Sequence, residues 1–198
     1  MRATIRPAIA ALVLAPALVA WTAYSNLTLQ PQSRLWVTGS STVRSFECKA
    51  GTLETSVEAE GAGAVQAVLA GQKAVKTVVV KVPAAKLDCA NGTMNGHMMK
   101  AIKGAENPVI EFRVASYDVE KGAAGVTGTL SGTLSLGGQQ KPITVVAAGR
   151  READGSLRVT GTHELKMTEY GLKPPSLMMG TMKVDNKVTV HFDLLLKE

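Results

Sequence analysis

The sequence predicts an all-β fold of about eight antiparallel strands, arranged as a sandwich or a closed barrel, with one short α-helix inserted midway. Three observations support this. Apolar residues recur with a period of two in most segments between residues 34 and 197, as in strands with one wet face. Val, Ala, Thr and Gly dominate, and aromatic residues make up only 4%. A long alternating segment spans residues 126–136, turns at Gly137-Gly138 and resumes at residues 142–146.

That alternating segment has one apolar face and one hydroxyl face. Glycine stands at two positions of the apolar phase, where it adds no side chain, and glycine inside a strand often marks a bend or a close approach. The thinned face favours a sheet curved around a cavity, and an eight-stranded barrel can hold one small ligand. The apolar phase is Val126, Gly128, Leu130, Gly132, Leu134 and Leu136, and the other is Thr127, Thr129, Ser131, Thr133 and Ser135.

The other elements follow in chain order. Residues 24–32 are polar and are expected to be a linker to a single domain over residues 33–198. Strands are expected at 34–47, 53–60, 76–82, 110–115, 143–147, 157–167 and 188–196, and residues 61–71 fit either a loop or a helical turn. The helix is expected from Ala90 to Gly104, because Asn91 or Asn95 can cap it and its apolar residues share one face, namely Met94, Met98, Ala101 and Ile102.

The N-terminus has the pattern of a secretory signal peptide over residues 1–23. Arg2 and Arg6 precede a short apolar stretch from Ala8 to Ala20, and small residues near Ala20 and Ala23 could mark cleavage. An uncleaved membrane anchor is the alternative. Either way the sequence predicts a periplasmic or secreted domain, anchored to the membrane if the segment is retained.

Export bears on the two cysteines, Cys48 and Cys89. An oxidising compartment favours a structural disulfide between them. The alternative is a redox-active or metal-binding pair, and a redox-active pair would make the protein a redox enzyme. Against both, the chain has no Cys-x-x-Cys and no second Cys/His cluster with ligand spacing.

Charge and motifs argue against several function classes. The net charge of +6 comes from scattered Lys and Arg without a dense basic run, which argues against nucleic-acid binding and allows weak attraction to a membrane surface. No nucleophile motif, phosphate-binding glycine loop or paired carboxylates indicate an enzyme, and no cofactor is implied. The three histidines are too far apart in sequence to suggest a metal site.

Three motifs in order resemble the YceI-like family and cover most of residues 34–197. They are Asn107-Pro-Val-Ile-Glu-Phe112, the hairpin from Ser131 to Ile143, and Thr168-Glu-Tyr-Gly171 followed by Val184-Asp-Asn-Lys-Val188. The resemblance implies an extended lipocalin-like antiparallel barrel, exported to the periplasm, that binds a polyisoprenoid or another apolar or amphipathic chain in a central tunnel without catalysis. Met167, Glu169 and Tyr170 depart from the residues usual in the family, and the cysteine pair is not a general family feature.

The leading hypothesis is a non-catalytic lipid-binding protein whose inward residues line the tunnel. The expected lining is Met94, Met98, Ile110, Phe112, Leu130, Leu134, Val159, His163, Leu165, Val190 and Phe192. His163 could contact a polar head group, or could simply be hydrogen-bonded in place or lie near a barrel mouth. The alternative function is an envelope interaction domain with a filled core. A dimer is compatible with the sequence.

The many methionines allow three interpretations: core filler, an adaptable lining for an apolar ligand, or a soft copper site. Met178 and Met179 lie in a Pro-rich loop that could cover the barrel mouth.

Overall fold

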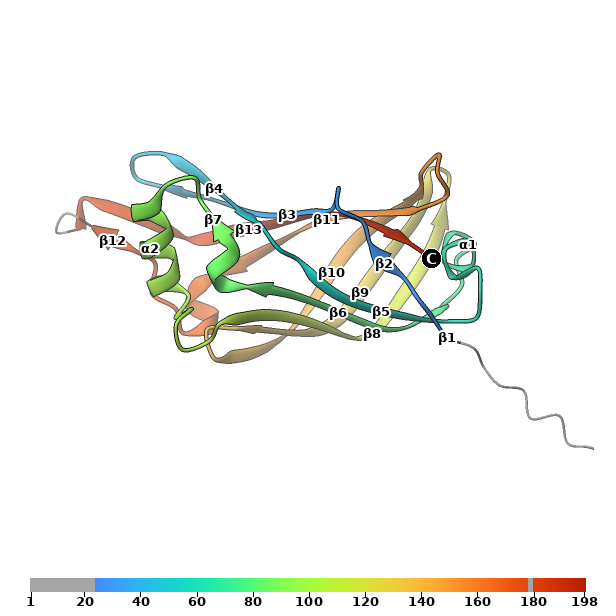
Figure 1. Ribbon diagram of the computed structural model, residues 1–198. Helices are drawn as coiled ribbons and strands as arrows, with labels where there is room; N and C mark the ends of the chain where they lie inside the picture. The colour runs from blue at the N-terminus through green and yellow to red at the C-terminus, as the bar shows by residue number, and fades with distance from the viewer. Residues whose placement is uncertain (1–23, 178–179) are drawn as a thin grey trace, which may run out of the picture.

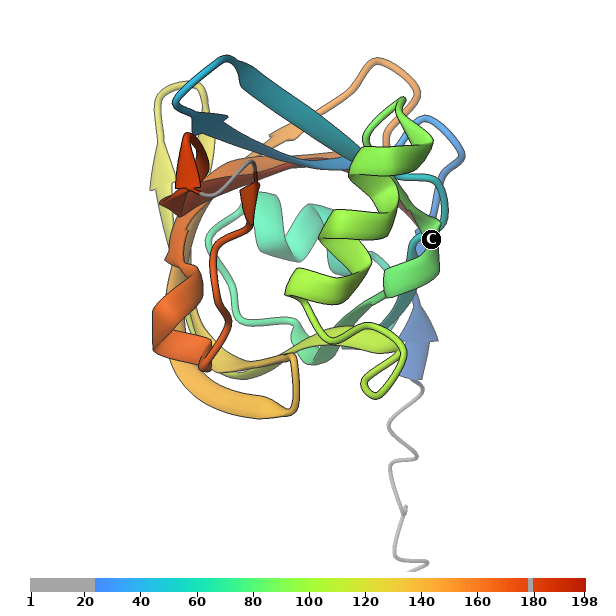
Figure 2. The same cartoon turned by 90° about the vertical axis from the view of Figure 1, so that its left-hand side faces the viewer.

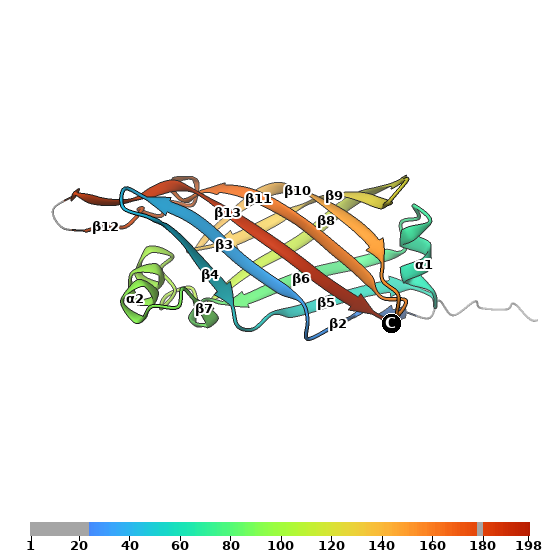
Figure 3. The same cartoon turned by 90° about the horizontal axis from the view of Figure 1, so that it is seen from above.

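The computed structural model describes residues 24–177 and 180–198, which form one curled antiparallel sheet. Its strands run obliquely to the long axis of the molecule (Figures 1 and 3). The strands are β1 (Tyr24–Asn26), β2 (Thr28–Leu29), β3 (Arg34–Ser41), β4 (Ser45–Ala50), β5 (Glu54–Glu60), β6 (Val75–Pro83), β7 (Leu87–Asp88), β8 (Val109–Gly122), β9 (Gly125–Leu136), β10 (Gln139–Arg151), β11 (Leu157–Lys166), β12 (Ser176–Leu177) and β13 (Met182–Lys197). The all-β, lipocalin-like prediction is confirmed, with more strands than expected because several are very short.

The main hydrogen-bonded path runs β1-β5-β6-β8-β9-β10-β11-β13-β3-β4-β7, and two short segments bridge its edges. At one end, β2 pairs with β13 while β1 pairs with β5. At the other end, β7 pairs with β4 just after the chain leaves β6. The sheet therefore curls into a barrel-like wall whose seam is crossed at both ends.

Two sequence predictions are corrected here. Residues 24–32 are not a linker, because they supply β1 and β2, and between those strands Leu27 is only 3% exposed. Residues 34–47 are not one strand but the hairpin β3–β4. The Ser41 hydroxyl accepts a hydrogen bond from the Arg44 N–H (3.2 Å) and donates one to the Arg44 carbonyl (2.8 Å), which closes the turn. A short turn of this kind breaks the apolar alternation too briefly to be recognised in the sequence.

Two α-helices lie at opposite ends of the barrel. Helix α1 (Ala64–Leu69) settles the ambiguity over residues 61–71. Six residues are too few for a stable isolated helix, so α1 depends on burial of its apolar face. At the N-terminus of α1, the carboxylate of Glu198 also accepts hydrogen bonds from the N–H groups of Gly63 (3.2 Å) and Val65 (2.9 Å).

Helix α2 (Gly92–Ala101) is the predicted inserted helix, with shorter bounds than expected. Asn91 is its N-cap, and its side-chain oxygen accepts a hydrogen bond from the Met94 N–H at 3.0 Å. Asn95 instead fixes the preceding turn, because it accepts from the Cys89 N–H and donates to Asp88. None of the helices in the described residues is long and apolar enough to cross a membrane.

The hydrophobic core is divided into two clusters, one at each end of the barrel. The floor cluster surrounds α1 and contains Leu27, Val57, Ala59, Ala64, Val65, Val68, Ala74, Val126, Leu157 and Leu196. The mouth cluster lies toward α2 and contains Leu134, Leu136, Leu165, Met167, Tyr170 and Leu172. Between them many inward side chains, such as Leu130, Val159 and Val190, are only half-buried. A divided core of this kind indicates unfilled space in the middle.

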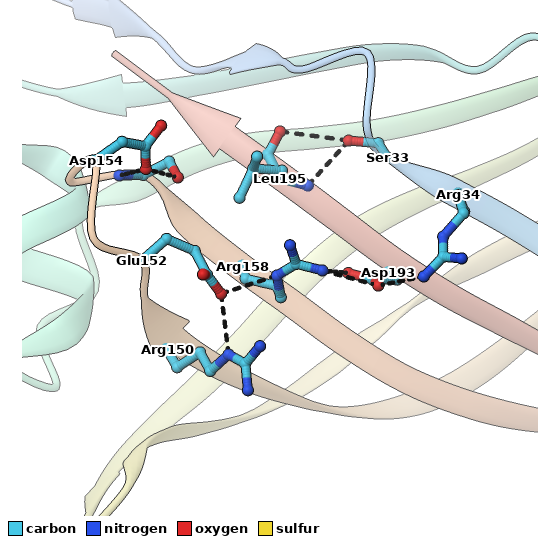
Figure 4. A network of polar contacts seen from close by, with 9 residues as sticks. Ser33, Arg34, Arg150, Glu152, Asp154, Arg158, Asp193 and Leu195 are labelled. Carbon is cyan, nitrogen blue, oxygen red and sulfur yellow. Dashed lines mark hydrogen bonds and ion pairs between the residues drawn. The ribbon is translucent and has the colours of Figure 1, made fainter.

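On the outside of the wall, a network of charges ties four strands together (Figure 4). Arg158 on β11 contacts Glu152 (2.8 Å) and Asp193 on β13 (2.9 Å). Arg34 on β3 also reaches Asp193 (3.1 Å), and Arg150 on β10 also reaches Glu152 (3.0 Å). These carboxylates raise the pKa of Arg158 above its ordinary value, and the negative charge of Asp193 is the largest cause.

Candidate functional site: an apolar lumen

A cavity of about 770 Å³ occupies the barrel interior, and apolar side chains from β3 to β13 and from both helices line it. All eleven residues expected from the sequence line this cavity: alternation identified the nine on strands, and the helical period identified Met94 and Met98. They are Met94, Met98, Ile110, Phe112, Leu130, Leu134, Val159, His163, Leu165, Val190 and Phe192. The predicted apolar face of α2 is likewise complete, because Ala101 and Ile102 join its two methionines at the cavity.

Two phenylalanine rings lie against glycines on the neighbouring strand. Phe46 on β4 pairs with Gly39 on β3, and Phe192 on β13 pairs with Gly161 on β11. A Cβ atom added at Gly39 or Gly161 would lie 2.4 or 2.5 Å from the ring, so each ring covers the position where a side chain would stand. An aromatic ring over a cross-strand glycine supports the strand pair. Phe46 and Phe192 also line the cavity.

The two glycines in the apolar phase of β9 have different roles. A Cβ at Gly128 would make only ordinary van der Waals contacts, the nearest at 3.6 Å to the Leu130 side chain, and Gly128 lines the cavity, so this glycine thins the wall without being required by a close approach. A Cβ at Gly132 would lie 2.3 Å from the Arg113 carbonyl oxygen. The register of β8 and β9 shifts between Val114 and Ser116 opposite Gly132. Gly132 is therefore required by close backbone approach at a β-bulge, which confirms the expected bend or close approach at this glycine and not the expectation that it widens the cavity.

The cavity opens at the α2 end and is closed at the α1 end. Lining residues at the α1 end, such as Val68 and Leu157, are buried. Lining residues at the α2 end are exposed, among them Arg44, Asn91 and Thr93. In the end-on view α2 lies across this end, and α1 is visible behind it at the far end (Figure 2). We call the α2 end the mouth.

The predicted disulfide is present and positions α2 at the mouth. Cys48 on β4 is bonded to Cys89, which lies just before the helix, and both cysteines line the cavity. The described residues contain no free cysteine, so the redox-enzyme alternative loses the reactive thiol pair on which it depends. The bond ties the segment that carries Met94 and Met98 to the barrel wall.

His163 is a titratable side chain at the apolar cavity. Its imidazole lines the cavity from β11 and makes no hydrogen bond within the described residues, so the expected hydrogen bond is absent; the other expectation, a place near the barrel mouth, fits its position two residues before Leu165 of the mouth cluster. Burial in this apolar setting lowers its pKa from the ordinary value of 6.5. Tyr117, by contrast, uses its hydroxyl oxygen to accept the Val75 N–H at 2.9 Å.

The other histidines lie elsewhere. His97 on α2 lines the mouth. His191 faces outward, stacks on Trp36 with ring centroids 5.0 Å apart and contacts the Thr38 hydroxyl at 2.8 Å. Within residues 24–177 and 180–198, no three His, Cys, Asp or Glu side chains are grouped to hold a metal ion.

Four methionines line the cavity, namely Met94, Met98, Met167 and Met182. The predicted lid residues Met178 and Met179 lie outside the described residues.

Sequence reasoning missed a part of the lining that is contributed by β3 to β6. These strands carry Leu35, Val37, Phe46, Val57, Val78, Val80 and Val82 at the cavity. The same period of two marks them in the sequence, but only the curl of the sheet brings them to face β9 and β11. Arg44 was also missed; it is the one Asp, Glu, Lys or Arg among the residues that line the cavity.

The sequence motifs meet in space at the mouth. Asn186 of the last motif accepts a hydrogen bond from the Thr168 N–H (2.9 Å) and donates one to the Thr168 hydroxyl (2.8 Å). Gly137 and Gly138, in the turn between β9 and β10, have positive φ values of 56° and 82°. A Cβ at Gly138 would lie 3.1 Å from the Asn107 side chain. The motifs therefore shape the corners of one end of the barrel.

Comparison with known proteins agrees with this architecture. The sequence matches the YceI-like domain over residues 27–196. No curated protein matched. Among solved structures, BcnA of Burkholderia cenocepacia is similar with a TM-score of 0.65 and 15% identity over 83% of this chain and 96% of that chain. A polyisoprenoid binding domain from Saccharophagus degradans, implicated in plant cell wall breakdown, is similar with a TM-score of 0.61 and 17% identity. The match covers 89% of this chain and 99% of that chain.

The Campylobacter jejuni YceI protein is a third similar structure, with a TM-score of 0.55 and 15% identity over 74% of this chain and 82% of that one. At these identities the structural likeness shows the shared fold. The sequence match spans nearly all of the described residues, from β2 to the end of β13. The chain therefore belongs to the YceI-like family.

Proposed function

We propose that this protein is a non-catalytic carrier that binds one long apolar or amphipathic chain, such as a polyisoprenoid, a quinone or a fatty-acid-like lipid, in the barrel lumen. The observation that carries the proposal is the continuous apolar cavity between the two core clusters. The Saccharophagus domain of the same fold, described as polyisoprenoid binding, supports this choice of ligand class.

The size of the cavity favours a ligand over an empty lumen. Side chains that line unfilled space lack the packing contacts that stabilise a core, so a ligand that filled these 770 Å³ would add stability to the fold. Water fills apolar cavities poorly, because it needs polar partners that this lining offers at few positions. A filled-core envelope domain, the alternative function, would not leave such a volume.

Apolar burial is sufficient to hold a chain in this lumen. At about 30 Å³ for a group the size of a water molecule, the cavity takes on the order of 25 such groups. Burying about 20 methylenes at ~0.8 kcal/mol each contributes roughly 16 kcal/mol before the costs of association. No specific polar contact is needed for tight binding of the tail.

The polar groups of the site favour a ligand whose head group stays near the mouth. Ser41, Asn91, Thr93 and His97 line the cavity there, while the floor is apolar throughout. The tail would enter first and run past His163 toward α1. The disulfide suits an oxidising compartment, so we include export in the proposal.

Organic extraction and mass spectrometry of the purified protein test the proposal. A single class of co-purified lipid is expected, together with uptake of an apolar fluorescent probe after delipidation. Leu130→Trp places a large ring at a half-buried lumen position and should reduce probe uptake, whereas Val146→Trp on the outer wall is the matched control. Repeated absence of bound lipid together with no probe uptake would contradict the proposal.

A further inference from the structure

The mouth end of the barrel carries a group of basic side chains without ionic partners. They are Arg44, Lys86, Lys100, Lys103, Lys173 and Lys183, and all six are exposed. They come from the β3–β4 turn, the turn before β7, helix α2 and its C-terminal side, and the segment from residue 173 to the start of β13. None of their side chains makes a hydrogen bond or an ion pair within the described residues.

The opposite end of the barrel is electrostatically balanced. At the mouth, segments 42–44, 84–108 and 167–183 carry these six bases and three acids, Asp88, Glu106 and Glu169. At the floor, segments 61–74, 118–125, 151–156 and 197–198 carry four bases and five acids. Three of the floor bases are engaged, Lys73 with Asp118 (2.6 Å), Lys197 with Asp154 (3.9 Å) and Arg151 with Gln66 (2.7 Å), and the fourth, Lys121, is offset by the excess of acids. The excess positive charge is therefore directed toward one end.

An exposed apolar residue lies at the same end. Val43, at the tip of the β3–β4 turn, is 64% exposed and also lines the cavity. An apolar tip beside unpaired bases is the combination that binds an anionic bilayer, because the bases meet lipid phosphates while the tip enters the interface.

We propose that the mouth end docks on an anionic membrane surface. This docking follows from charge and exposure, and it does not rest on the cargo proposed above. If the cargo is a lipid, docking has a clear advantage: a tail that passed through water would expose each methylene at a cost of ~0.8 kcal/mol, and a mouth held against the bilayer avoids that exposure.

Vesicle binding tests the proposal with protein comprising residues 24–198, which contain all the described strands, both core clusters and the disulfide. Binding is expected to vesicles of phosphatidylcholine mixed with phosphatidylglycerol, to weaken with salt, and to be absent from pure phosphatidylcholine. The mouth variant is Lys100→Gln/Lys173→Gln/Lys183→Gln. Each neutralised base should weaken binding about fivefold, so the triple variant should bind about 100-fold more weakly.

The matched control is Lys73→Gln/Lys121→Gln/Arg151→Gln, which removes the same net charge from the floor end and should bind nearly as well as the unchanged protein. Equal losses in the two variants would show that only net charge matters and would overturn the proposal. Binding to a soluble polyanion without binding to anionic vesicles would also overturn it.

An independent measurement reports orientation. Val43→Trp should be quenched by lipids with brominated acyl chains in the anionic vesicles. Val146→Trp, on the outer wall and 55% exposed, should not be quenched. Quenching of Val146→Trp alone would place the barrel side-on and refute mouth-first docking. Cargo analysis by mass spectrometry is separate from both readouts, so failure of one proposal is distinguishable from failure of the other.

Discussion

Substituting Gly128 is the sharpest test of the lumen, because the same strand supplies a control four residues away. A Cβ atom at Gly128 would make only ordinary contacts, from 3.6 Å, at a position that lines the cavity, whereas a Cβ at Gly132 would lie 2.3 Å from the Arg113 carbonyl oxygen. Both glycines are in the inward phase of β9, and neither has a positive φ. Gly128→Leu and Gly132→Leu therefore add the same atoms with opposite expected consequences for stability.

The expected effects follow from the geometry. The four carbons that Leu adds at Gly128 occupy about 120 Å³, at about 30 Å³ each, of the 770 Å³ lumen. The longest bound chain loses room for about four methylenes, or ~3 kcal/mol, which is roughly 200-fold in affinity. A strand glycine costs about 0.5–1 kcal/mol relative to Ala, so the ligand-free protein should melt about 1–4 °C higher. Gly132→Leu should destabilise the fold by about 1–3 kcal/mol through forced backbone shifts.

The assay combines thermal unfolding of delipidated protein with competition between apolar ligands of increasing chain length. Gly128 pairs with Val119 and Ala147, toward the floor, so Gly128→Leu should shift the preference to shorter chains. If Gly128→Leu bound the longest chain as tightly as the unchanged protein, the lumen would not be the binding site. If Gly132→Leu were as stable as the unchanged protein, the interpretation of the bulge would be wrong.

Three further predictions concern the disulfide, His163 and the outer charges. Cys48→Ala/Cys89→Ala should lower the free energy of unfolding by about 4 kcal/mol in the chain-entropy model for a separation of 41 residues, as measured by urea denaturation; an unchanged midpoint would count against a structural role. Because the folded pKa of His163 is lowered, the unfolded chain binds more protons near pH 6, so its contribution to stability is present above pH 6.5 and decreases on acidification below that value. His163→Gln should therefore flatten the pH dependence of the melting temperature on the acid side, and an identical profile in both proteins would refute this. Arg158→Gln leaves Glu152 and Asp193 with one arginine each, so it should lower thermal stability without changing lipid uptake, and a loss of uptake in a stably folded variant would contradict an outer, structural role.

Local patterns in the sequence carried the prediction of the lining. Leu130 and Phe192 were assigned to the lumen because a period of two places alternate side chains on one face of any strand, whatever its neighbours. Helix α2 was recognised because Asn91 can cap it and Met94 and Met98 share a face. The pairing of Cys48 with Cys89 needed only the count of cysteines and the expected compartment.

Other features depend on contacts between residues far apart in the chain. The role of Gly132 is set by a bulge in β8, and the polar segment at residues 24–32 becomes strand because β5 and β13 have free edges beside it. Arg44 and Lys173 lie at the same end of the barrel only because the sheet is curled. The sequence by itself determined which side chains face inward, because alternation is local. The tertiary structure decided where the wall closes, how much of the interior stays empty and which end carries the unpaired charge, because these depend on register and curvature across the whole sheet.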